Sequence, residues 1–294
     1  MTELLQGLVL AHLGQGIAVE AENAIVLCQS LRKLDTVAVG DQVLWRQSAP
    51  DQGRIEELLP RRSVLLRPAK NGKTRPVAAN LDAVFIVFAV EPACDFLLLD
   101  QYLAVCENSD IDVGLVLNKT DLPTSEIIEQ ELASYQALGY AVYRVSAANA
   151  TGLTELAAAL QGQVTILTGQ SGVGKSSLTN ALIPDKELKT NTISATTKHG
   201  RHTTTAATLY HLNGGGDLID SPGVAIFGLA DLNLPQLAQG YREFQPLLRE
   251  CQFNDCRHIT DKGCAVRAAA ETGEISANRY QRFLKLIAKM PQGH

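Results

Sequence analysis

The sequence lacks an apolar run long enough to cross a lipid bilayer as a helix, which argues against a membrane partner. Residues 1–10 hold no basic region and include Glu3, so they do not resemble a signal peptide. Only six cysteines occur, and Cys28, Cys94 and Cys106 are scattered in apolar contexts typical of buried thiols. We therefore expect a cytoplasmic protein with reduced cysteines.

The sequence also lacks a strong net charge of either sign, because its formal charge is −5 over 294 residues. The distribution is uneven: residues 1–76 carry ten basic and eight acidic side chains, residues 77–230 seven and sixteen, and residues 231–294 nine and seven. The two flanks are thus better suited than the middle to meet a polyanion, although a net charge of +2 on each flank means little alone.

Short apolar runs separated by turn residues fill residues 1–70 and predict strands at 7–10, 16–19, 24–27, 43–45 and 53–55. This spacing is typical of an OB-type β-barrel, a fold that commonly binds oligonucleotides. A structural or protein-binding barrel fits the pattern equally well.

A polar, proline-bounded stretch follows over 60–80, and its charged residues are all basic: Arg61, Arg62, Arg67, Lys70, Lys73 and Arg75. We interpret residues 71–80 as a basic linker between two domains. Its charge suits either a solvated linker or contact with phosphates.

Strand and helix patterns alternate from residue 81 to residue 182. The near-continuous apolar run 81–90 predicts a strand buried on both faces of a parallel sheet. Further strands are predicted at 113–117, 141–145 and 164–167, and helices at 96–108, 125–138 (capped by Thr124), 153–160 and 177–182. This rhythm predicts a doubly wound α/β domain over 81–230, with ligands at the carboxyl ends of the strands.

A glycine-rich loop joins the last of these strands to the last of these helices, and it comprises Gly169, Gln170, Ser171, Gly172, Val173, Gly174, Lys175, Ser176 and Ser177. In this context the pattern G-x-x-x-x-G-K-S is typical of a phosphate-binding loop, whose backbone N–H groups and helix N-terminus bind phosphate oxygens. Lys175 would reach the β- and γ-phosphates, and the Ser176 hydroxyl would ligate Mg²⁺.

A second loop follows the strand predicted at 113–117 and comprises Asn118, Lys119, Thr120 and Asp121. The Asp121 carboxylate can accept two hydrogen bonds from N1 and N2 of guanine, whereas adenine offers no matching pair of donors. Ser146 and Ala147 follow the next strand and can place a backbone N–H near guanine O6. The sequence therefore predicts a guanine nucleotide site.

A third loop, with Asp220 and Gly223, follows a hairpin predicted at 208–212 and 218–219. Asp220 can hold the magnesium shell and the Gly223 N–H can sense a γ-phosphate. The long polar segment 184–205 ends in three threonines, one of which would complete that shell: Thr203, Thr204 and Thr205. We favour Thr204 or Thr205, and expect the segment to become ordered on GTP binding.

Near the C-terminus, one short window holds Cys251, Cys256, His258 and Cys264. Three thiolates and one imidazole suit a closed tetrahedral zinc site, and the alternative is a group of buried cysteines. Residues 276–290 predict an amphipathic helix, with Tyr280, Phe283, Leu284 and Ile287 apolar and a basic stripe of Arg282, Lys285 and Lys289. The stripe suits either a solvated face or RNA contact.

The order of the motifs is unusual, because the guanine-type loops at 118–121 and 146–147 precede the phosphate loop at 169–176 and the loop at 220–223. This order indicates a circularly permuted GTPase domain, which chain termini that lie close together make possible. Together with the Gly200–Thr205 stretch (G-R-H-T-T-T) and the zinc-type pattern, it resembles the ribosome small subunit-dependent GTPase A family over nearly the whole chain. The resemblance implies an N-terminal OB-type barrel, a permuted P-loop GTPase domain and, over 231–294, a mostly helical zinc module.

The resemblance further implies GTP hydrolysis in late maturation of the 30S ribosomal subunit, stimulation by that subunit, and contacts of the barrel and zinc module with 16S rRNA. We expect a monomer that binds GTP and GDP with Mg²⁺ and one structural zinc ion. A Ras-type enzyme orients water with a glutamine after the D-x-x-G motif, but Val224 stands there. We therefore expect slow intrinsic hydrolysis, with Lys175, Thr204 and Thr205 in the catalytic machinery.

His202 is the candidate to position the attacking water, and rRNA contact or loop stabilisation explains it equally well. Two other functions stay open. One is a GTP-gated RNA-binding switch in which hydrolysis is incidental. The other is an ATP-dependent P-loop enzyme, which Asp121 disfavours.

Overall fold

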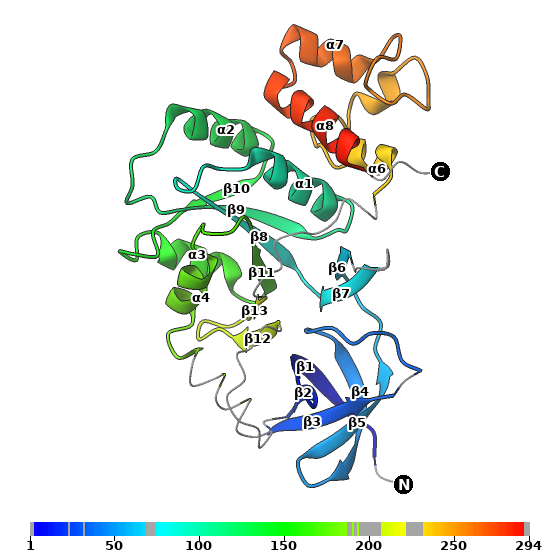
Figure 1. Cartoon of the computed structure of the whole chain (residues 1–294), viewed down its shortest axis with the longest axis vertical. Helices are drawn as coiled ribbons and strands as arrows, with labels where there is room; N and C mark the ends of the chain where they lie inside the picture. Colours follow the sequence, from blue (N-terminus) through cyan, green and yellow to red (C-terminus); the bar gives the residue numbers. More distant parts are fainter. Residues whose placement is uncertain are drawn as a thin grey trace.

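The computed structural model describes residues 3–22, 24–31, 33–68, 74–186, 190, 193, 207–221 and 232–290. Figure 1 shows a β-barrel formed by the N-terminal strands, a sheet flanked by helices in the middle, and a group of helices at the C-terminal end of the chain. This arrangement confirms the predicted fold class of barrel, α/β domain and helical C-terminal region.

Five strands form the barrel: β1 (Leu5–Leu13), β2 (Gly16–Ala21), β3 (Ala24–Ser30), β4 (Gln42–Ala49) and β5 (Gln52–Leu58). They pair in the order β1-β2-β3-β5-β4, and a β1–β4 pairing closes the ring. Alternate residues point inward, so that Val9, Val19, Trp45 and Ile55 fill an apolar interior. The five predicted strands are therefore confirmed.

The basic stretch 60–80, whose second half is the expected linker, contains a hairpin of β6 (Val64–Pro68) and β7 (Thr74–Ala79). Residues 71–73 of the expected linker lie outside the described residues. The basic composition hid the apolar positions Leu65 and Ala78, which are buried in the core that the barrel and the sheet share. That burial explains why the stretch folds against both neighbours.

Six strands form the central sheet: β8 (Ala83–Ala89), β9 (Asp112–Asn118), β10 (Ala141–Arg144), β11 (Val164–Thr168), β12 (Thr208–His211) and β13 (Asp217–Asp220). Their order is β10-β9-β8-β11-β13-β12, and all neighbours are parallel except β12 and β13. The carboxyl ends of the parallel strands thus lie along one edge, which carries the loops that the sequence singled out.

Helices cover both faces of this sheet, and β8 is therefore buried on both sides. α1 (Phe96–Glu107) and α2 (Glu126–Ala137) pack with Val84, Ile86 and Phe88 of β8. α3 (Leu153–Leu160) and α4 (Lys175–Leu182) pack with Phe85 and Val87 on the other face. The predicted doubly wound arrangement is confirmed, with one correction: Ser125, not Thr124, caps α2, because its hydroxyl accepts a hydrogen bond from the Ile128 N–H.

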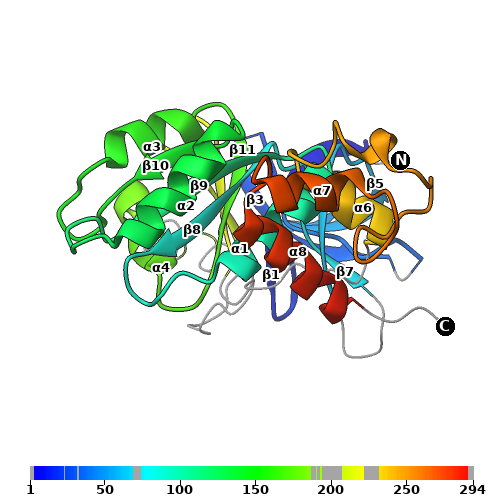
Figure 2. The same ribbon diagram turned by 90° about the horizontal axis from the view of Figure 1, so that it is seen from above.

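The C-terminal region comprises α6 (Leu234–Gln239), a short 3₁₀ helix η2 (Leu248–Glu250), α7 (Ala265–Thr272) and α8 (Ala277–Lys289). Figure 2 shows α8 alongside α1, and the two helices are in contact. Tyr241, Phe244 and Phe283 form its aromatic centre, with ring centroids 4.8–5.4 Å apart.

A buried ionic network joins α8 to α1 and α2. Arg279 donates to Asp100 Oδ1 (2.5 Å), and Arg282 donates to Asp100 Oδ2 (2.5 Å) and, through two nitrogens, to the Glu131 carboxylate (2.9 and 2.8 Å). Asp100 is 1% exposed and Arg282 is 8% exposed. The predicted basic stripe is therefore wrong for Arg282, whose charge faces two buried carboxylates, whereas Lys285 and Lys289 are exposed.

The barrel meets the sheet at one residue pair between strands, Ala11 of β1 and Thr208 of β12. His211 strengthens this junction, because its Nδ1 lies 2.6 Å from Asp217 Oδ1 and its Nε2 lies 2.9 Å from Glu20 Oε2 of the barrel. The hydrogen bond to Asp217 and the charge of Glu20 outweigh partial burial and raise the pKa of His211 to about 9.

We expect this junction to weaken as the pH rises. Because the folded-state pKa of His211 lies above its unfolded value, its stabilisation is complete below pH 6.5 and is lost as the pH rises through 9. His211 is about half exposed, so solvent screening limits the loss to about 1 kcal/mol. Urea unfolding at pH 6 and pH 9.5 measures it, and His211→Gln should remove that part of the pH dependence. An unchanged pH dependence in the variant would contradict the assignment.

Within the described residues, no helix combines the length and the apolar character needed to cross a membrane.

Candidate nucleotide site and metal centre

The glycine-rich loop lies between β11 and α4, as the sequence predicts. Lys175 turns back over the loop, and its Nζ donates to the carbonyl oxygens of Gly169 and Gln170, both at 2.7 Å. Desolvation by burial lowers the pKa of Lys175. Ser171, Ser176 and Ser177 are exposed at the same loop, so their hydroxyls are open to a ligand.

Two positions in the loop require glycine, both because their φ is positive and because a neighbouring residue lies too close for a Cβ atom. Gly169 has φ 139°, and a Cβ there would lie 1.9 Å from the Val87 carbonyl oxygen of β8. Gly174 has φ 94°, and a Cβ there would lie 2.3 Å from Asn118 Nδ2. The loop is therefore packed directly against β8 and against the loop that begins at Asn118.

Asn118 connects three of the predicted loops. Its Nδ2 donates to the Val173 carbonyl oxygen of the phosphate loop (2.9 Å), and its Oδ1 accepts from the Ala147 N–H (3.1 Å). The Asn118 side chain is buried, so these bonds are shielded from water. Lys119 adds a bond from Nζ to the Gly172 carbonyl oxygen (2.8 Å). The predicted loops at 118–121, 146–147 and 169–176 thus form one site.

Asp121 is exposed at the rim of this site, and its Oδ1 accepts a hydrogen bond from Ser146 Oγ at 2.5 Å. Ser146 is fully buried, so its hydroxyl holds the carboxylate in a defined position. Thr120 binds the same neighbouring loop through its N–H, which donates to the Val145 carbonyl oxygen (3.2 Å). Among the described residues, the second carboxylate oxygen of Asp121 accepts no hydrogen bond, so it is open to a ligand.

Gln170 makes a contact that sequence reasoning missed. Its Nε2 donates to the Ala93 carbonyl oxygen (3.1 Å) and its Oε1 accepts from the Asp95 N–H (3.2 Å). Asp95 in turn caps α1 through the Leu98 N–H. The phosphate loop is therefore tied to the start of the helix that carries Asp100. Nothing in the sequence pattern signals this link, because 75 residues separate the partners.

Asp220 ends β13, the strand next to β11, so it lies at the same sheet edge as the phosphate loop. Its Oδ2 is 2.6 Å from Nζ of Lys186, a residue that the sequence analysis did not single out. The carboxylate thus faces a cation, which suits the predicted role near a metal ion. The other residues predicted for this site lie outside the described residues: His202, Thr203, Thr204, Thr205 and Gly223.

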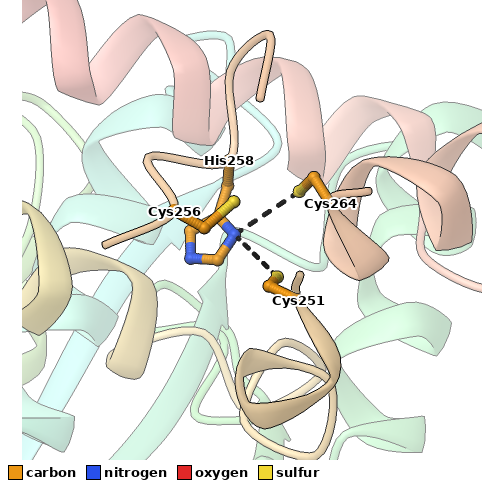
Figure 3. Close-up of side chains that lie close together, drawn as sticks. All are labelled: Cys251, Cys256, His258 and Cys264. Atoms are coloured by element: carbon orange, nitrogen blue, oxygen red, sulfur yellow. Dashed lines mark hydrogen bonds between the residues drawn. The ribbon is translucent and has the colours of Figure 1, made fainter. Parts of the chain in front are cut away.

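The three cysteines and the histidine come together in the C-terminal region, as Figure 3 shows. His258 Nδ1 lies 3.6 Å from Cys251 Sγ and 3.5 Å from Cys264 Sγ, and all four ligand atoms lie within 4.8 Å of one another. Ligand atoms at the corners of a zinc tetrahedron are about 3.5–3.8 Å apart. The donor set and its spacing therefore fit one zinc ion.

The surroundings of this cluster hold its members in place. Cys264 also caps α7, since its sulfur accepts from the Arg267 N–H (3.3 Å). Tyr280 Oη donates to the His258 carbonyl oxygen (2.8 Å). Burial raises the pKa of Cys256 to about 12 and lowers the pKa of His258. A bound cation would favour the thiolate form of these cysteines.

Comparison with solved structures supports the permuted arrangement. The crystal structure of YjeQ from Thermotoga maritima matches with a TM-score of 0.78 and 29% identity, covering 98% of each chain. The structure of YloQ, a circularly permuted GTPase, matches with a TM-score of 0.75 and 26% identity, covering 98% of this chain and 95% of that one.

Sequence comparison agrees. The RsgA GTPase family model matches residues 58–230. A small ribosomal subunit biogenesis GTPase from Chromohalobacter salexigens is 46% identical over 288 residues, covering 96% of this chain and 85% of that protein. A protein of the same name from Azotobacter vinelandii is 42% identical, covering 97% and 86%. With its nucleotide loops, fold and relatives in agreement, the chain belongs to the RsgA GTPase family and is a hydrolase acting on GTP.

Proposed function

We propose that this chain acts in late maturation of the 30S ribosomal subunit, binds 16S rRNA and hydrolyses GTP when it meets that subunit. The names of the relatives, small ribosomal subunit biogenesis GTPases, support a role in assembly of this subunit. The main structural support for nucleotide binding is the Asn118 side chain, because its hydrogen bonds join the loops predicted to bind guanine to the phosphate loop.

In the proposed complex, backbone N–H groups of residues 169–174 bind the phosphates and Lys175 exchanges its two carbonyl partners for phosphate oxygens. Asp121, held by Ser146, accepts the guanine N1 and N2 hydrogens. Bound Mg²⁺ would neutralise charge on the β- and γ-phosphates, and Ser176, Thr204 and Asp220 would hold it. On sequence grounds, His202 positions the attacking water, with Thr205 as the alternative to Thr204.

The experiment that tests this function compares GTP turnover by the purified chain alone, with 30S subunits and with 50S subunits. Because Val224 replaces the usual glutamine, we expect slow turnover alone and acceleration of about tenfold or more by 30S subunits only. Equal rates in all three mixtures would overturn the proposal. His202→Ala should lose the acceleration, and retained acceleration would exclude a catalytic role for His202.

A GTP-gated RNA-binding switch is the second candidate, and the absence of a glutamine at Val224 favours it. In that case, affinity for 30S subunits differs between a non-hydrolysable GTP analogue and GDP, while turnover has no effect on release. Under the first proposal, hydrolysis speeds release from the subunit. Release kinetics with GTP and with the analogue separate the two.

We propose that the Cys251–Cys264 cluster binds one structural zinc ion. The expected content is one zinc per chain, and Cys264→Ser should lose the metal and lower the melting temperature, because the metal contributes folding free energy. Cys28→Ala, which removes a buried barrel thiol, should keep the zinc. Full zinc content in Cys264→Ser would contradict this ligand set.

The RNA contacts are proposed on the two flanks of the chain. Arg67 and Arg75 are exposed and face one another across the β6–β7 hairpin, where like charges repel without a polyanion. Lys285 and Lys289 are exposed on α8. Ribosome assembly would place the protein in the cytoplasm, and we expect it to act there as a monomer.

A further inference from the structure

Lys186 and Asp220 form an ion pair in the part of the site where the metal would sit. Lys186 follows α4 and Asp220 ends β13, so the pair joins the segment after α4 to the strand beside β11, which leads into the phosphate loop. The Nζ–Oδ2 distance is 2.6 Å, and the two side chains are only 19% and 20% exposed. This partial burial makes the pair stronger than a surface ion pair, since water screens it less.

The backbone of Lys186 is held by Thr190, beside the Tyr210 ring. Thr190 Oγ1 donates to the Lys186 carbonyl oxygen (2.8 Å) and lies 2.8 Å from Tyr210 Oη of β12. The Lys186 ammonium also lies 5.7 Å from the centre of the Tyr210 ring. An ammonium group that leaves Asp220 therefore has a nearby aromatic face on which to rest, without any change in the backbone.

An ammonium group and a hydrated Mg²⁺ ion compete for the same carboxylate. The lysine charge is single and is carried on a flexible stem, so a divalent cation displaces it more easily than it would a bidentate arginine. Two cations bound to one carboxylate also repel one another, because they lie too close together for bulk water to screen their charges.

We propose that Lys186 is a latch on Asp220, occupying the carboxylate in the metal-free protein and leaving it for the Tyr210 face when Mg²⁺ arrives with GTP. This rests on the proposed function in one respect, namely that Asp220 faces the magnesium shell. Lys186 acts through Asp220 and is thus a positioning residue. The latch makes nucleotide binding more dependent on magnesium concentration than the metal ligands alone would make it.

The test is a magnesium titration of GTP-analogue binding, followed by the fluorescence of a labelled non-hydrolysable nucleotide. Lys186→Met keeps the length of the stem and removes the charge. We expect the half-saturating Mg²⁺ concentration to fall about three- to tenfold, the change that a partly buried ion pair implies. Lys186→Arg should raise this concentration, because a guanidinium is harder to displace. Lys33→Met, in the exposed stretch between β3 and β4, should match the wild type.

Two results would overturn the latch: an unchanged half-saturating concentration in Lys186→Met, or a higher one, which would mean that Lys186 holds Asp220 in place for the metal. Asp220→Asn separates this failure from that of the proposed site. If Asp220→Asn leaves the magnesium dependence unaltered, the assignment of Asp220 to the metal shell is wrong. If it raises the half-saturating concentration while the Lys186 variants match the wild type, only the latch is wrong.

Discussion

Asp100→Asn is expected to destabilise the protein by about 3–5 kcal/mol, because it breaks the buried ion pairs of Asp100 with Arg279 and Arg282. Each arginine then keeps only its glutamate partner, Glu243 or Glu131. Asp100 accepts from Arg279, Arg282 and Tyr135, each at 2.5 Å. The substitution keeps the shape of the side chain, so the loss of stability contains no contribution from a cavity. Urea unfolding followed by circular dichroism measures the loss, and amide hydrogen exchange in α8 locates it.

Glu129→Gln is the matched control, since it also turns a carboxylate that binds arginine through two oxygens into an amide. The Glu129–Arg144 pair is 45% and 43% exposed and should contribute less than about 1 kcal/mol. A similar small loss in both variants would mean that water reaches the Asp100 network and that the C-terminal helices are not fixed to α1 by charge.

Asp121→Asn is expected to change base preference from guanine to xanthine, with GTP affinity falling by about 10²–10⁴-fold. Two charge-assisted hydrogen bonds to the base, at about 1.5–3 kcal/mol each, account for this range. An asparagine amide instead donates to the additional carbonyl of xanthine. Competition by guanosine, xanthosine and adenosine diphosphates for a fluorescent nucleotide measures the three affinities.

Asp112→Asn provides the control, because this exposed residue lies at the opposite end of β9 and should leave all three affinities unchanged. If ADP competes as well as GDP with the wild-type protein, Asp121 does not select guanine. If Asp121→Asn keeps full affinity for GDP, the base is held by other groups.

Local sequence was enough to predict the parallel strands and the loops at their ends. The run 81–90 is apolar throughout because β8 is covered on both faces, and glycine and lysine at 169–175 are required by backbone geometry and phosphate charge. Short-range chemistry fixes such features, so they can be recognised without knowledge of the tertiary fold. The Cys251–His258–Cys264 spacing belongs to the same class.

Contacts between distant residues could not be predicted. In a helical pattern Arg282 is one more basic residue, and only its partners Asp100 and Glu131, 182 and 151 residues away in sequence, make it a buried one. Lys186 likewise follows no periodic pattern, and the fold alone brings it to Asp220. The hairpin at 64–79 was hidden because its charged residues outweigh the few apolar ones that pack inward.

The single residue pair between β1 and β12 has a mechanical consequence. β12 is paired along its whole length with β13, whereas among the described strands of the barrel it pairs at one position, Thr208 with Ala11 of β1, to which His211 adds its contact with Glu20. If the barrel is pulled away from the sheet, the β1–β12 pairing should break before the β12–β13 pairing does. A displacement of the barrel would therefore reach β12 first, and β13, whose last residue is Asp220, only through the β12–β13 pairing.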